Sequence, residues 1–289
     1  MNEQRVTVGF IGLGSQGAPI ARRIIESGHP TVLWARRSAT LDSFRDTNAI
    51  VAASPAELAA HARFIGICVV DDNDVEDVLL RSDGIIAGIK PGAIVAIHST
   101  IHPATCTRIG ERLADKGALL IDAPVSGGGR AAASGELLVM VGADDTVFRQ
   151  ALPVLSTFGN PVLHLGPLGS GQLAKLVNNL LFISGISLAH DATELGSALG
   201  LDPETLIEVL GEGSARSFAL STYAGLRASG FSPDAPGPSM VARLLRKDVD
   251  IACAIGLDRG APLGRLPEVA DAVLATLGSP RTPAPTDDQ

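Results

Sequence analysis

Cysteine is scarce in this chain. The three residues, Cys68, Cys106 and Cys253, are odd in number and far apart among 289 positions. Such a set predicts neither a disulfide framework nor a cysteine-based metal cluster, and it suits a reducing compartment. We therefore expect a cytoplasmic protein with no metal site.

The sequence also lacks a long uninterrupted apolar run. Segment 173–189 comes closest, but Lys175, Asn178 and Asn179 interrupt it before the roughly 18 apolar residues of a membrane span are reached. Near the N-terminus, Arg5 is followed by only about seven apolar residues before glycines intervene, which does not match a signal peptide. These patterns predict no membrane partner.

Positive charge is in the minority. The chain carries 23 Lys and Arg against 31 Asp and Glu, for a formal net charge of -8. A nucleic-acid binder would normally show a basic stripe, so we expect no nucleic-acid partner. The composition is 46% hydrophobic and 19% charged, which predicts a sizeable core and excludes global disorder.

Short apolar runs alternate with helical patterns over residues 1–160. Most of the runs are β-branched and apolar on both faces, as in a buried parallel sheet. Strand alternating with helix predicts a doubly wound α/β sheet. The expected strands are Val6–Ile11, Thr31–Trp34, Phe64–Val70, Ala93–Ile97, Leu119–Ile121 and Leu137–Val141, and the expected helices lie near 16–27, 55–61, 73–80, 104–115 and 145–156.

From about Pro167 onward the pattern becomes helical, beginning with one long helix over 171–199. Pro161, Gly166, Pro167 and Gly169 cluster just before it, which predicts a domain boundary near residues 161–167. We expect an α/β domain over 1–165, an all-α domain over 166–278 joined by the long helix, and a disordered tail over 279–289 that is rich in Pro, Thr and Asp. The further expected helices are 203–211, 216–228, 239–259 and 265–277.

A glycine-rich turn follows the first expected strand. The run Gly12-Leu13-Gly14-Ser15-Gln16-Gly17 is G-x-G-x-x-G between a strand and a helix, the context that a dinucleotide site requires. Gly12 would allow the tight turn, Gly14 the approach of a pyrophosphate, and Gly17 the packing of helix on strand. The helix N-terminus then offers N–H groups and a positive dipole end to phosphate. The alternative is a turn that serves only helix–sheet packing.

The second strand ends at Arg36-Arg37-Ser38, without the Asp or Glu that an NAD site usually carries for the ribose hydroxyl. A guanidinium binds phosphate through charge-assisted hydrogen bonds, so this pattern favours NADP over NAD. Otherwise the two arginines are solvated loop charges.

Lys175 and Asn179 lie four residues apart in the long helical segment, so they share one face of the expected helix. A bare amine is costly to bury on an apolar face, and it usually has a task or a partner. The pair suggests proton transfer beside a hydride carrier. The alternative is an ordinary helix whose lysine extends to solvent.

Two further segments follow expected strands. Thr100 lies at the carboxyl end of its strand, the edge where open α/β sheets bind ligands. Ser126-Gly127-Gly128-Gly129 exposes backbone N–H groups that can hold a carboxylate, or it is simply a flexible loop.

Two apparent metal patterns have simpler explanations. The acidic run Val70–Asp74 lacks the glycine and terminal Glu of a calcium loop, and its Asp and Asn residues favour a helix N-cap with a helix start at 73–75. His98 and His102 have the spacing of some zinc helices, but Pro103 suggests that the helix begins only there.

The chain carries four characteristic blocks, which are Gly9–Gly17, Asp122–Gly128, Gly169–Asn179 and Lys247-Asp248. Together they resemble the β-hydroxyacid dehydrogenase family, which includes 3-hydroxyisobutyrate dehydrogenases and tartronate semialdehyde reductases. The resemblance spans residues 6 to about 278. Gln16 stands where the family usually has Met, and Arg130 departs from a run of small residues, which can alter substrate selection.

The resemblance implies a Rossmann domain joined to an all-α domain, an active site in the cleft between them, and a homodimer or homotetramer. It implies that Lys175 is the general acid/base and that Asn179 positions the substrate. Ser126, Gly127 and Gly128 would hold the substrate carboxylate, Thr100 would lie near the nicotinamide, Val69 and Val70 would face the adenosine side, and Lys247 would close over the cofactor.

The sequence thus predicts hydride transfer between NADP(H) and a small β-hydroxy acid or its semialdehyde or keto form. An imine or other carbonyl reductase on the same scaffold is the alternative, although related imine reductases generally lack the lysine. A non-catalytic NADP-binding sensor is a third reading, and the chain has no appended basic linker to favour it. Candidates for the substrate pocket are Ser214–Phe218, Phe231 and Met240.

Overall fold

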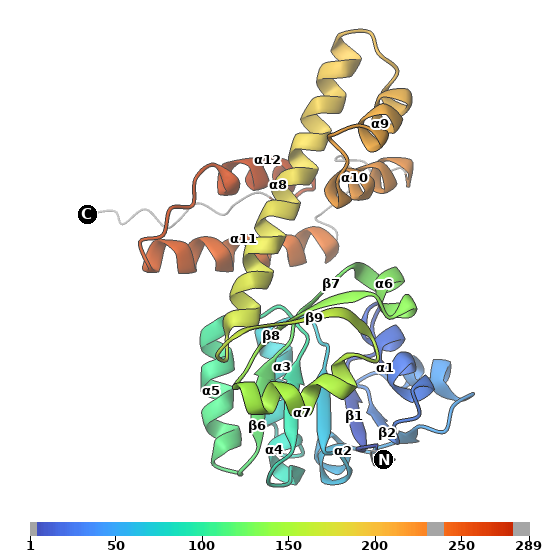
Figure 1. Cartoon of the computed structure of the whole chain (residues 1–289), viewed down its shortest axis with the longest axis vertical. Helices are drawn as coiled ribbons and strands as arrows, with labels where there is room; N and C mark the ends of the chain where they lie inside the picture. Colours follow the sequence, from blue (N-terminus) through green and yellow to red (C-terminus); the bar gives the residue numbers. More distant parts are fainter. Residues whose placement is uncertain (1–4, 230–239, 280–289) are drawn as a thin grey trace. The chain divides into compact units, whose positions relative to one another are not determined.

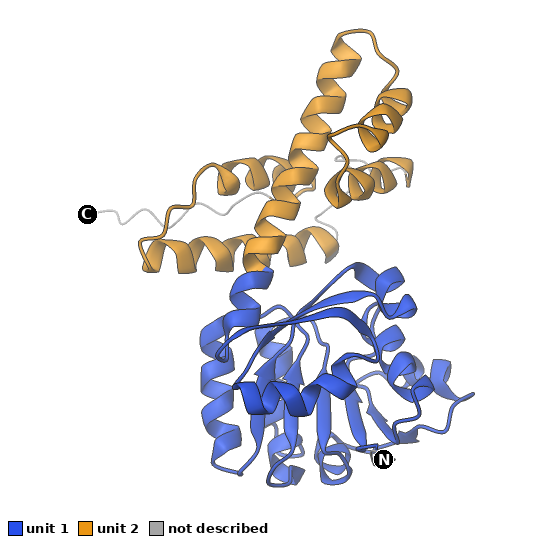
Figure 2. Cartoon of the chain, in the orientation of Figure 1, with its two compact units in different colours: residues 1–175 blue, residues 176–289 orange. Residues whose placement is uncertain are grey.

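The computed structural model describes residues 5–229 and 240–279 and divides into two compact units, Met1–Lys175 and Leu176–Gln289 (Figure 2). Ser279 is buried, and its N–H donates to the Leu274 carbonyl at 2.8 Å. The rest of the expected tail lies outside the described residues.

The first unit is built on a nine-stranded sheet within its described residues (Figure 1). The strand order is β3-β2-β1-β4-β5-β6-β8-β7, with β9 paired to β8. The order reverses between β1 and β4, as in a doubly wound nucleotide-binding fold. The strands are β1 (Val8–Ile11), β2 (Thr31–Trp34), β3 (Ile50–Val51), β4 (Phe64–Ile67), β5 (Ile94–Ile97), β6 (Leu119–Asp122), β7 (Val125–Ser126), β8 (Leu137–Gly142) and β9 (Gly159–Gly166).

Helices cover both faces of this sheet, because successive strand residues point to opposite sides. Along β1, Phe10 joins the core cluster that contains Ile20 and Ile24, whereas Ile11 joins the cluster that contains Leu58 and Val75. The two faces therefore have separate cores. Helices α1 (Gly17–Glu26), α6 (Gly128–Ser134) and α7 (Asp145–Leu155) pack into the first, and α2 (Pro55–His61), α3 (Asp72–Leu80), α4 (Ile85–Gly88) and α5 (Pro103–Ala114) pack into the second.

The doubly wound prediction is confirmed, but the expectation of a parallel sheet is wrong at one end. Strands β1 to β6 pair in parallel, whereas β8 runs antiparallel to β6 and β7. Leu137–Val141 is buried almost throughout, and a buried apolar run does not encode strand direction.

Strand β9 was not expected, because Pro161 and Gly166 indicated a boundary. It pairs only with β8, in parallel and with irregular register, so it lies at an edge. Proline is tolerated on an edge strand, where its missing N–H has no partner to lose.

The helix N-caps observed near Asp71 and Pro103 agree with the explanation that the sequence predicted for the two apparent metal patterns. Asp71 accepts a hydrogen bond from the Asp74 N–H at 3.0 Å and caps α3, which begins at Asp72, slightly earlier than expected. His102 Nδ1 accepts from the Ala104 N–H at 3.0 Å and caps α5, which begins at Pro103.

All regular secondary structure among the described residues of the second unit is helical. Its core joins Ile183 of α8, Leu220 of α10, Val249 of α11 and Leu274 of α12. The helices agree closely with the expected ranges: α8 (Ser170–Ala198), which begins in the first unit, α9 (Pro203–Glu212), α10 (Phe218–Ala228), α11 (Met240–Asp258) and α12 (Leu266–Thr276).

Helix α8 is long and apolar enough to cross a membrane by length and composition alone, with a mean hydropathy of 1.2 and half of the relevant window buried. A core helix of a folded domain passes the same test, so this single helix is weak support for a span.

Candidate functional site

The predicted cofactor residues of the first unit follow the carboxyl ends of neighbouring parallel strands. Gly12 follows β1, Val69 follows β4, Thr100 follows β5 and Asp122 ends β6. Because parallel strands end at one edge, these segments lie along the same side of the sheet. The order reverses between β1 and β4, which is where such sheets bind ligands.

The three motif glycines have the geometry that the motif requires. Gly12 has a φ of 94°, and a Cβ there would lie 2.1 Å from the Cys68 carbonyl oxygen. A Cβ on Gly17 would lie 1.8 Å from the Gly12 carbonyl oxygen. By contrast, no atom lies within 4 Å of a Cβ built on Gly14. The turn therefore has no room for a side chain at Gly12 or Gly17, whereas the space beside Gly14 is open to a ligand.

The N-terminus of α1 carries no anion of its own. Gln16 occupies the N-cap without a side-chain capping bond, and the first turn contains no acidic residue. Leu13 is buried in the core, whereas Gly14 and Ser15 are exposed. Free N–H groups and a positive dipole end can bind phosphate here, so the residues fit a dinucleotide.

The Ser126-Gly127-Gly128 segment lies beside this loop. A Cβ on Gly129 would lie 2.9 Å from the Ser15 carbonyl oxygen, so the two glycine segments are in contact. Gly127 and Gly128 have φ values of 130° and 73°, and the space around a Gly128 Cβ is open. The fold thus brings the predicted carboxylate loop to the predicted pyrophosphate loop.

The loop after β4 is bound to the loop after β5. Ser99 Oγ accepts a hydrogen bond from the Val69 N–H and donates one to the Val69 carbonyl, both at 2.9 Å. Val69 is half-buried and Val70 is 45% exposed. These two hydrogen bonds hold the backbone of Val69 beside the segment that carries Thr100.

The two arginines after β2 differ in their surroundings. Arg36 Nη1 lies 2.8 Å from Asp74 Oδ1 in a salt bridge, although its side chain is 68% exposed. Arg37 is exposed and forms no salt bridge with another described residue. Ser38 is exposed at the start of a 3-10 helix. Of the two expected guanidinium groups, that of Arg36 is therefore paired with Asp74, and that of Arg37 is available to a ligand.

Asp122 is a fully buried carboxylate that binds the N-terminus of α8. Its Oδ1 accepts from the Gly169 N–H at 2.6 Å, and its Oδ2 accepts from the Gln172 N–H at 2.7 Å. A Cβ on Gly171 would lie 2.3 Å from the Met140 carbonyl oxygen, so glycine permits this close approach. Burial raises the pKa of Asp122 to about 6, against the backbone hydrogen bonds that lower it.

Gln172 extends this anchor to the end of β5. Its side chain is fully buried, with Nε2 donating to the Ser99 carbonyl at 2.8 Å and Oε1 accepting from the Ile101 N–H at 3.1 Å. Both bonds flank Thr100. The first turn of α8 is therefore held to the strand edge through its backbone and through one side chain.

Lys175 lies in the next turn of α8 and is half-buried. Residues three apart share a helix face, so Lys175 lies near the face that Gln172 turns toward Thr100. Asn179 continues that face by one more turn. The expected helix is confirmed, and the i, i+4 relation of Lys175 and Asn179 holds.

In the second unit, Asn179 and Lys247 meet at one carboxylate. The buried Asn179 Nδ2 donates to Asp248 Oδ2 at 2.6 Å, and Lys247 Nζ lies 2.9 Å from Asp248 Oδ1. Asn179 Oδ1 also accepts from Asn178 Nδ2 at 3.2 Å. Both ends of the Asn179 amide are thus engaged by neighbouring side chains.

Sequence reasoning missed the roles of Asp122, Gln172 and Asp248. All three stand inside the blocks that carry the family resemblance, but their partners are up to 73 positions away in the chain. For Asp122 and Gln172 the signal was a polar residue among apolar and small residues, which marks a buried hydrogen-bonding group without identifying its partner. Asp248 stands in the charged run Arg246–Asp250 and gives no such signal.

The histidine pair does not form a metal-type arrangement. His98 is buried between Phe10 and Phe158, and its Nδ1 bonds the Ala123 carbonyl at 2.9 Å. Burial lowers the pKa of His98 to about 4. Among the described residues, no group of three or more His, Cys, Asp or Glu side chains could hold a metal ion.

The expected pocket residues are only partly described. Phe218 is 63% exposed at the start of α10 and contacts the ring of Phe182. Phe231 and the side chain of Met240 lie outside the described residues.

Comparison with protein families gives one match for each part of the chain. Residues 7–166 match the NAD binding domain of 6-phosphogluconate dehydrogenase. Residues 169–281 match the NAD-binding domain of NADP-dependent 3-hydroxyisobutyrate dehydrogenase. The two matches meet at the segment that Asp122 anchors.

Comparison with individual proteins agrees. The 2-(hydroxymethyl)glutarate dehydrogenase of Eubacterium barkeri is 32% identical over 267 residues, 90% of this chain and 86% of that protein. The crystal structure of a 3-hydroxyisobutyrate dehydrogenase from Salmonella typhimurium has a TM-score of 0.83 at 26% identity, covering 94% of this chain and 93% of that one. Psf3 in complex with NADP+ and 2-OPP has a TM-score of 0.80 at 27% identity, covering 93% of each chain.

Proposed function

The chain belongs to the β-hydroxyacid dehydrogenase family as a 3-hydroxyisobutyrate dehydrogenase-like, NAD(P)-dependent oxidoreductase, and we propose that it uses NADP(H) to interconvert a small β-hydroxy acid with its semialdehyde or keto form. Lys175 is the general acid/base of this proposal. The observation that supports it best is the anchoring of the first turn of α8 at the strand edge by Asp122 and Gln172.

That anchor matters because proton transfer needs a fixed donor. A misplaced general acid loses much of its effect, since the proton must move over hydrogen-bonding distance. Four hydrogen bonds between 2.6 and 3.1 Å hold Gly169 and Gln172 to Asp122 of β6 and to the segment that follows β5. Lys175 follows Gln172 by less than one helical turn, so the same hydrogen bonds fix the position of its backbone.

The residues that would hold the reactants are those of the strand edge. The Gly12–Gly17 loop would bind the pyrophosphate, Val69 and Val70 the adenosine side, and Thr100 the nicotinamide end. Ser126, Gly127 and Gly128 would bind the substrate carboxylate through N–H and hydroxyl groups. The bound nicotinamide supplies the hydride acceptor in oxidation and the donor in reduction.

Lys175 Nζ would move the proton. As an ammonium it donates to the substrate carbonyl oxygen in reduction, and as an amine it removes the hydroxyl proton in oxidation. Asn179 would position the substrate oxygen, and Lys247 would close over the cofactor. Since Asn179 and Lys247 both bind Asp248, that carboxylate would orient the two together.

The preference for NADP rests on Arg37 and Arg36. Arg37 is exposed without a salt bridge to a described residue, and it suits a 2′-phosphate. Arg36 could join only by exchanging its salt bridge with Asp74. A homologous structure contains NADP+, which supports the same preference.

The decisive experiment compares the wild type, Lys175→Ala and a surface control, Lys90→Ala, in NADPH oxidation with a panel of small semialdehydes and β-keto acids. We expect turnover in Lys175→Ala to fall by about 10²–10⁴-fold, as for loss of a general acid, while NADPH binding stays intact. Normal turnover in Lys175→Ala would refute the assignment. NADPH binding by the wild type without turnover of any substrate would favour the sensor, and turnover of cyclic imines alone would favour the imine reductase.

Self-association and cytoplasmic location belong to the same proposal. Val177, Leu181, Leu188 and Leu195 are each about 60% exposed and follow one face of α8, which suits a homodimer or homotetramer. Cys68 and Cys106 are free thiols, which suits the cytoplasm. Sedimentation of the wild type and of Leu188→Glu tests the first point, since a monomeric wild type would contradict it.

A further inference from the structure

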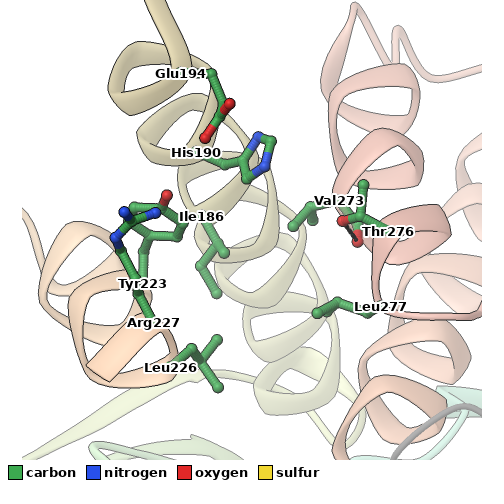
Figure 3. Close-up of a pocket in the computed structure, with 9 residues that line it drawn as sticks. All are labelled: Ile186, His190, Glu194, Tyr223, Leu226, Arg227, Val273, Thr276 and Leu277. Atoms are coloured by element: carbon green, nitrogen blue, oxygen red, sulfur yellow. Dashed lines mark hydrogen bonds between the residues drawn. The ribbon is translucent and has the colours of Figure 1, made fainter. Parts of the chain in front are cut away.

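The helical unit contains a cavity of about 210 Å³, lined by faces of α8, α10 and α12 (Figure 3). None of the residues proposed for hydride or proton transfer lines it. The volume equals that of about seven liquid water molecules, and it is smaller than the roughly 300 Å³ at which sites for drug-sized ligands begin. A ligand that fits it is a small metabolite.

One part of the wall is aliphatic. Ile186 of α8, Leu226 of α10, and Val273 and Leu277 of α12 present branched side chains, and three of these four residues are at most 8% exposed. Such a wall favours an apolar body of about the size of one aliphatic side chain.

Tyr223 gives the cavity a polar anchor. The residue is only 7% exposed, it lines the cavity, and its hydroxyl forms no hydrogen bond with a described residue. The hydroxyl oxygen is not among the buried polar atoms that lack a partner, so it reaches open space. It therefore offers an unused donor and acceptor to a molecule in the cavity.

Opposite charges stand on two different walls. Arg227 comes from α10 beside Tyr223, and Glu194 comes from α8 beside His190 (Figure 3). Neither forms a salt bridge with a described residue, whereas His190 Nδ1 lies 3.3 Å from Asp191 Oδ1. Arg227 acts at longer range on Asp202, where it lowers the pKa less than the hydrogen bonds from Thr205 do. The cavity thus presents one cation and one anion that are not paired with each other.

We propose that this cavity binds a small aliphatic α-amino acid as its zwitterion. The Arg227 guanidinium and the Tyr223 hydroxyl would bind the carboxylate, Glu194 would bind the ammonium group, and the aliphatic wall would cover the side chain. A simple carboxylic acid would meet Glu194 without a compensating charge, and a simple amine would meet Arg227 in the same way. The zwitterion is the form that leaves neither charge unmatched.

Isothermal titration of the full-length protein with L-leucine tests this proposal. We expect saturable binding at one site per chain. Glycine lacks the apolar body, 4-methylpentanoate lacks the amine and 3-methylbutylamine lacks the carboxylate, so each should bind at least about tenfold more weakly. Equal binding of the acid or the amine would overturn the zwitterion assignment, and so would the absence of saturable leucine binding.

Matched variants locate the site. Arg227→Met and Glu194→Gln should each weaken leucine binding by about tenfold or more, whereas Arg265→Met and Glu208→Gln, exposed residues that do not line the cavity, should leave it unchanged. Tyr223→Phe should weaken leucine binding by a smaller factor while the fold is kept.

A variant of the proposed dehydrogenase site is the control for location. Lys175→Ala should bind leucine normally, and loss of binding in that variant would place the amino acid in the dehydrogenase site and refute binding in the cavity. Binding that survives both Arg227→Met and Glu194→Gln would refute it as well.

Discussion

Two helices, α1 and α8, begin at the same edge of the sheet of the first unit, and their N-termini differ in how their N–H groups are satisfied. Helix α8 receives the buried carboxylate of Asp122, which accepts from the N–H groups of Gly169 and Gln172. Helix α1 has no acidic residue in its first turn and no side-chain cap, and Gly14 leaves open space beside it. Both termini carry the same positive dipole end. The N-terminus of α8 is neutralised by Asp122, whereas the N-terminus of α1 has no internal anion and, in the proposed function, binds phosphate.

The largest effect is expected from removing the internal anion of α8. Asp122→Ala leaves the Gly169 and Gln172 N–H groups buried without acceptors, and we expect a loss of about 4 kcal/mol in the free energy of unfolding. Urea unfolding measures it. Asp145→Ala removes an exposed first-turn acid of α7 and should cost less than about 1 kcal/mol. Similar losses in the two variants would show that Asp122 is not a special anchor.

The second effect depends on pH. The raised pKa of Asp122, about 6 against 3.8 for an ordinary Asp, means that the folded state holds the proton more strongly than the unfolded chain. Its contribution to stability is full below about pH 4, is lost as the pH rises through about 6, and is constant above that, a change of about 3 kcal/mol.

Asp122→Asn cannot titrate, so the stability of the wild type relative to this variant should fall between pH 4 and pH 7. His98 acts in the opposite direction, because its lowered pKa of about 4 gives stability that is present above about pH 6.5 and is lost as the pH falls. His98 is common to both proteins and cancels in the difference. A pH-independent difference would contradict the raised pKa of Asp122.

The third effect comes from giving α1 an internal anion like that of α8. A side chain at Gly14 meets no atom within 4 Å of its Cβ, so Gly14→Asp should fold normally. Its carboxylate would compete with phosphate at the helix N-terminus, and we expect NADPH affinity to fall by about 100-fold. Gly14→Asn has the same size without the charge and should lose distinctly less, by fluorescence titration. Equal losses in both variants would point to steric blocking instead of charge.

The smallest effect concerns the 2′-phosphate that distinguishes NADPH from NADH. Arg37→Ala should weaken NADPH binding by about tenfold and leave NADH binding unchanged, because only NADPH carries the 2′-phosphate. Arg36→Ala should cost less, since Arg36 is already paired with Asp74. Titrating both variants with both cofactors tests the order. A wild type that prefers NADH would refute the arginine argument.

The features that the sequence predicted correctly are local. The G-x-G-x-x-G turn, a helix N-cap within Val70–Asp74 and the helical ranges of the second unit each depend on residues close together in the chain. The features that it missed depend on partners chosen by the fold. The antiparallel direction of β8, the edge position of β9 around Pro161 and the pairing of Arg36 with Asp74 have no counterpart in spacing or periodicity.

The properties of Lys175 and Asn179 also divide into those that the sequence determined and those that the tertiary structure determined. The i, i+4 spacing places them on one helix face, and the sequence alone determines this because helix periodicity is a property of the backbone. Their surroundings were decided by tertiary structure: Gln172 and Asp122 hold the turn before Lys175, and Asp248 holds Asn179 from 69 positions away. A buried polar group must find a partner, but only the folded chain determines which one comes within hydrogen-bonding distance.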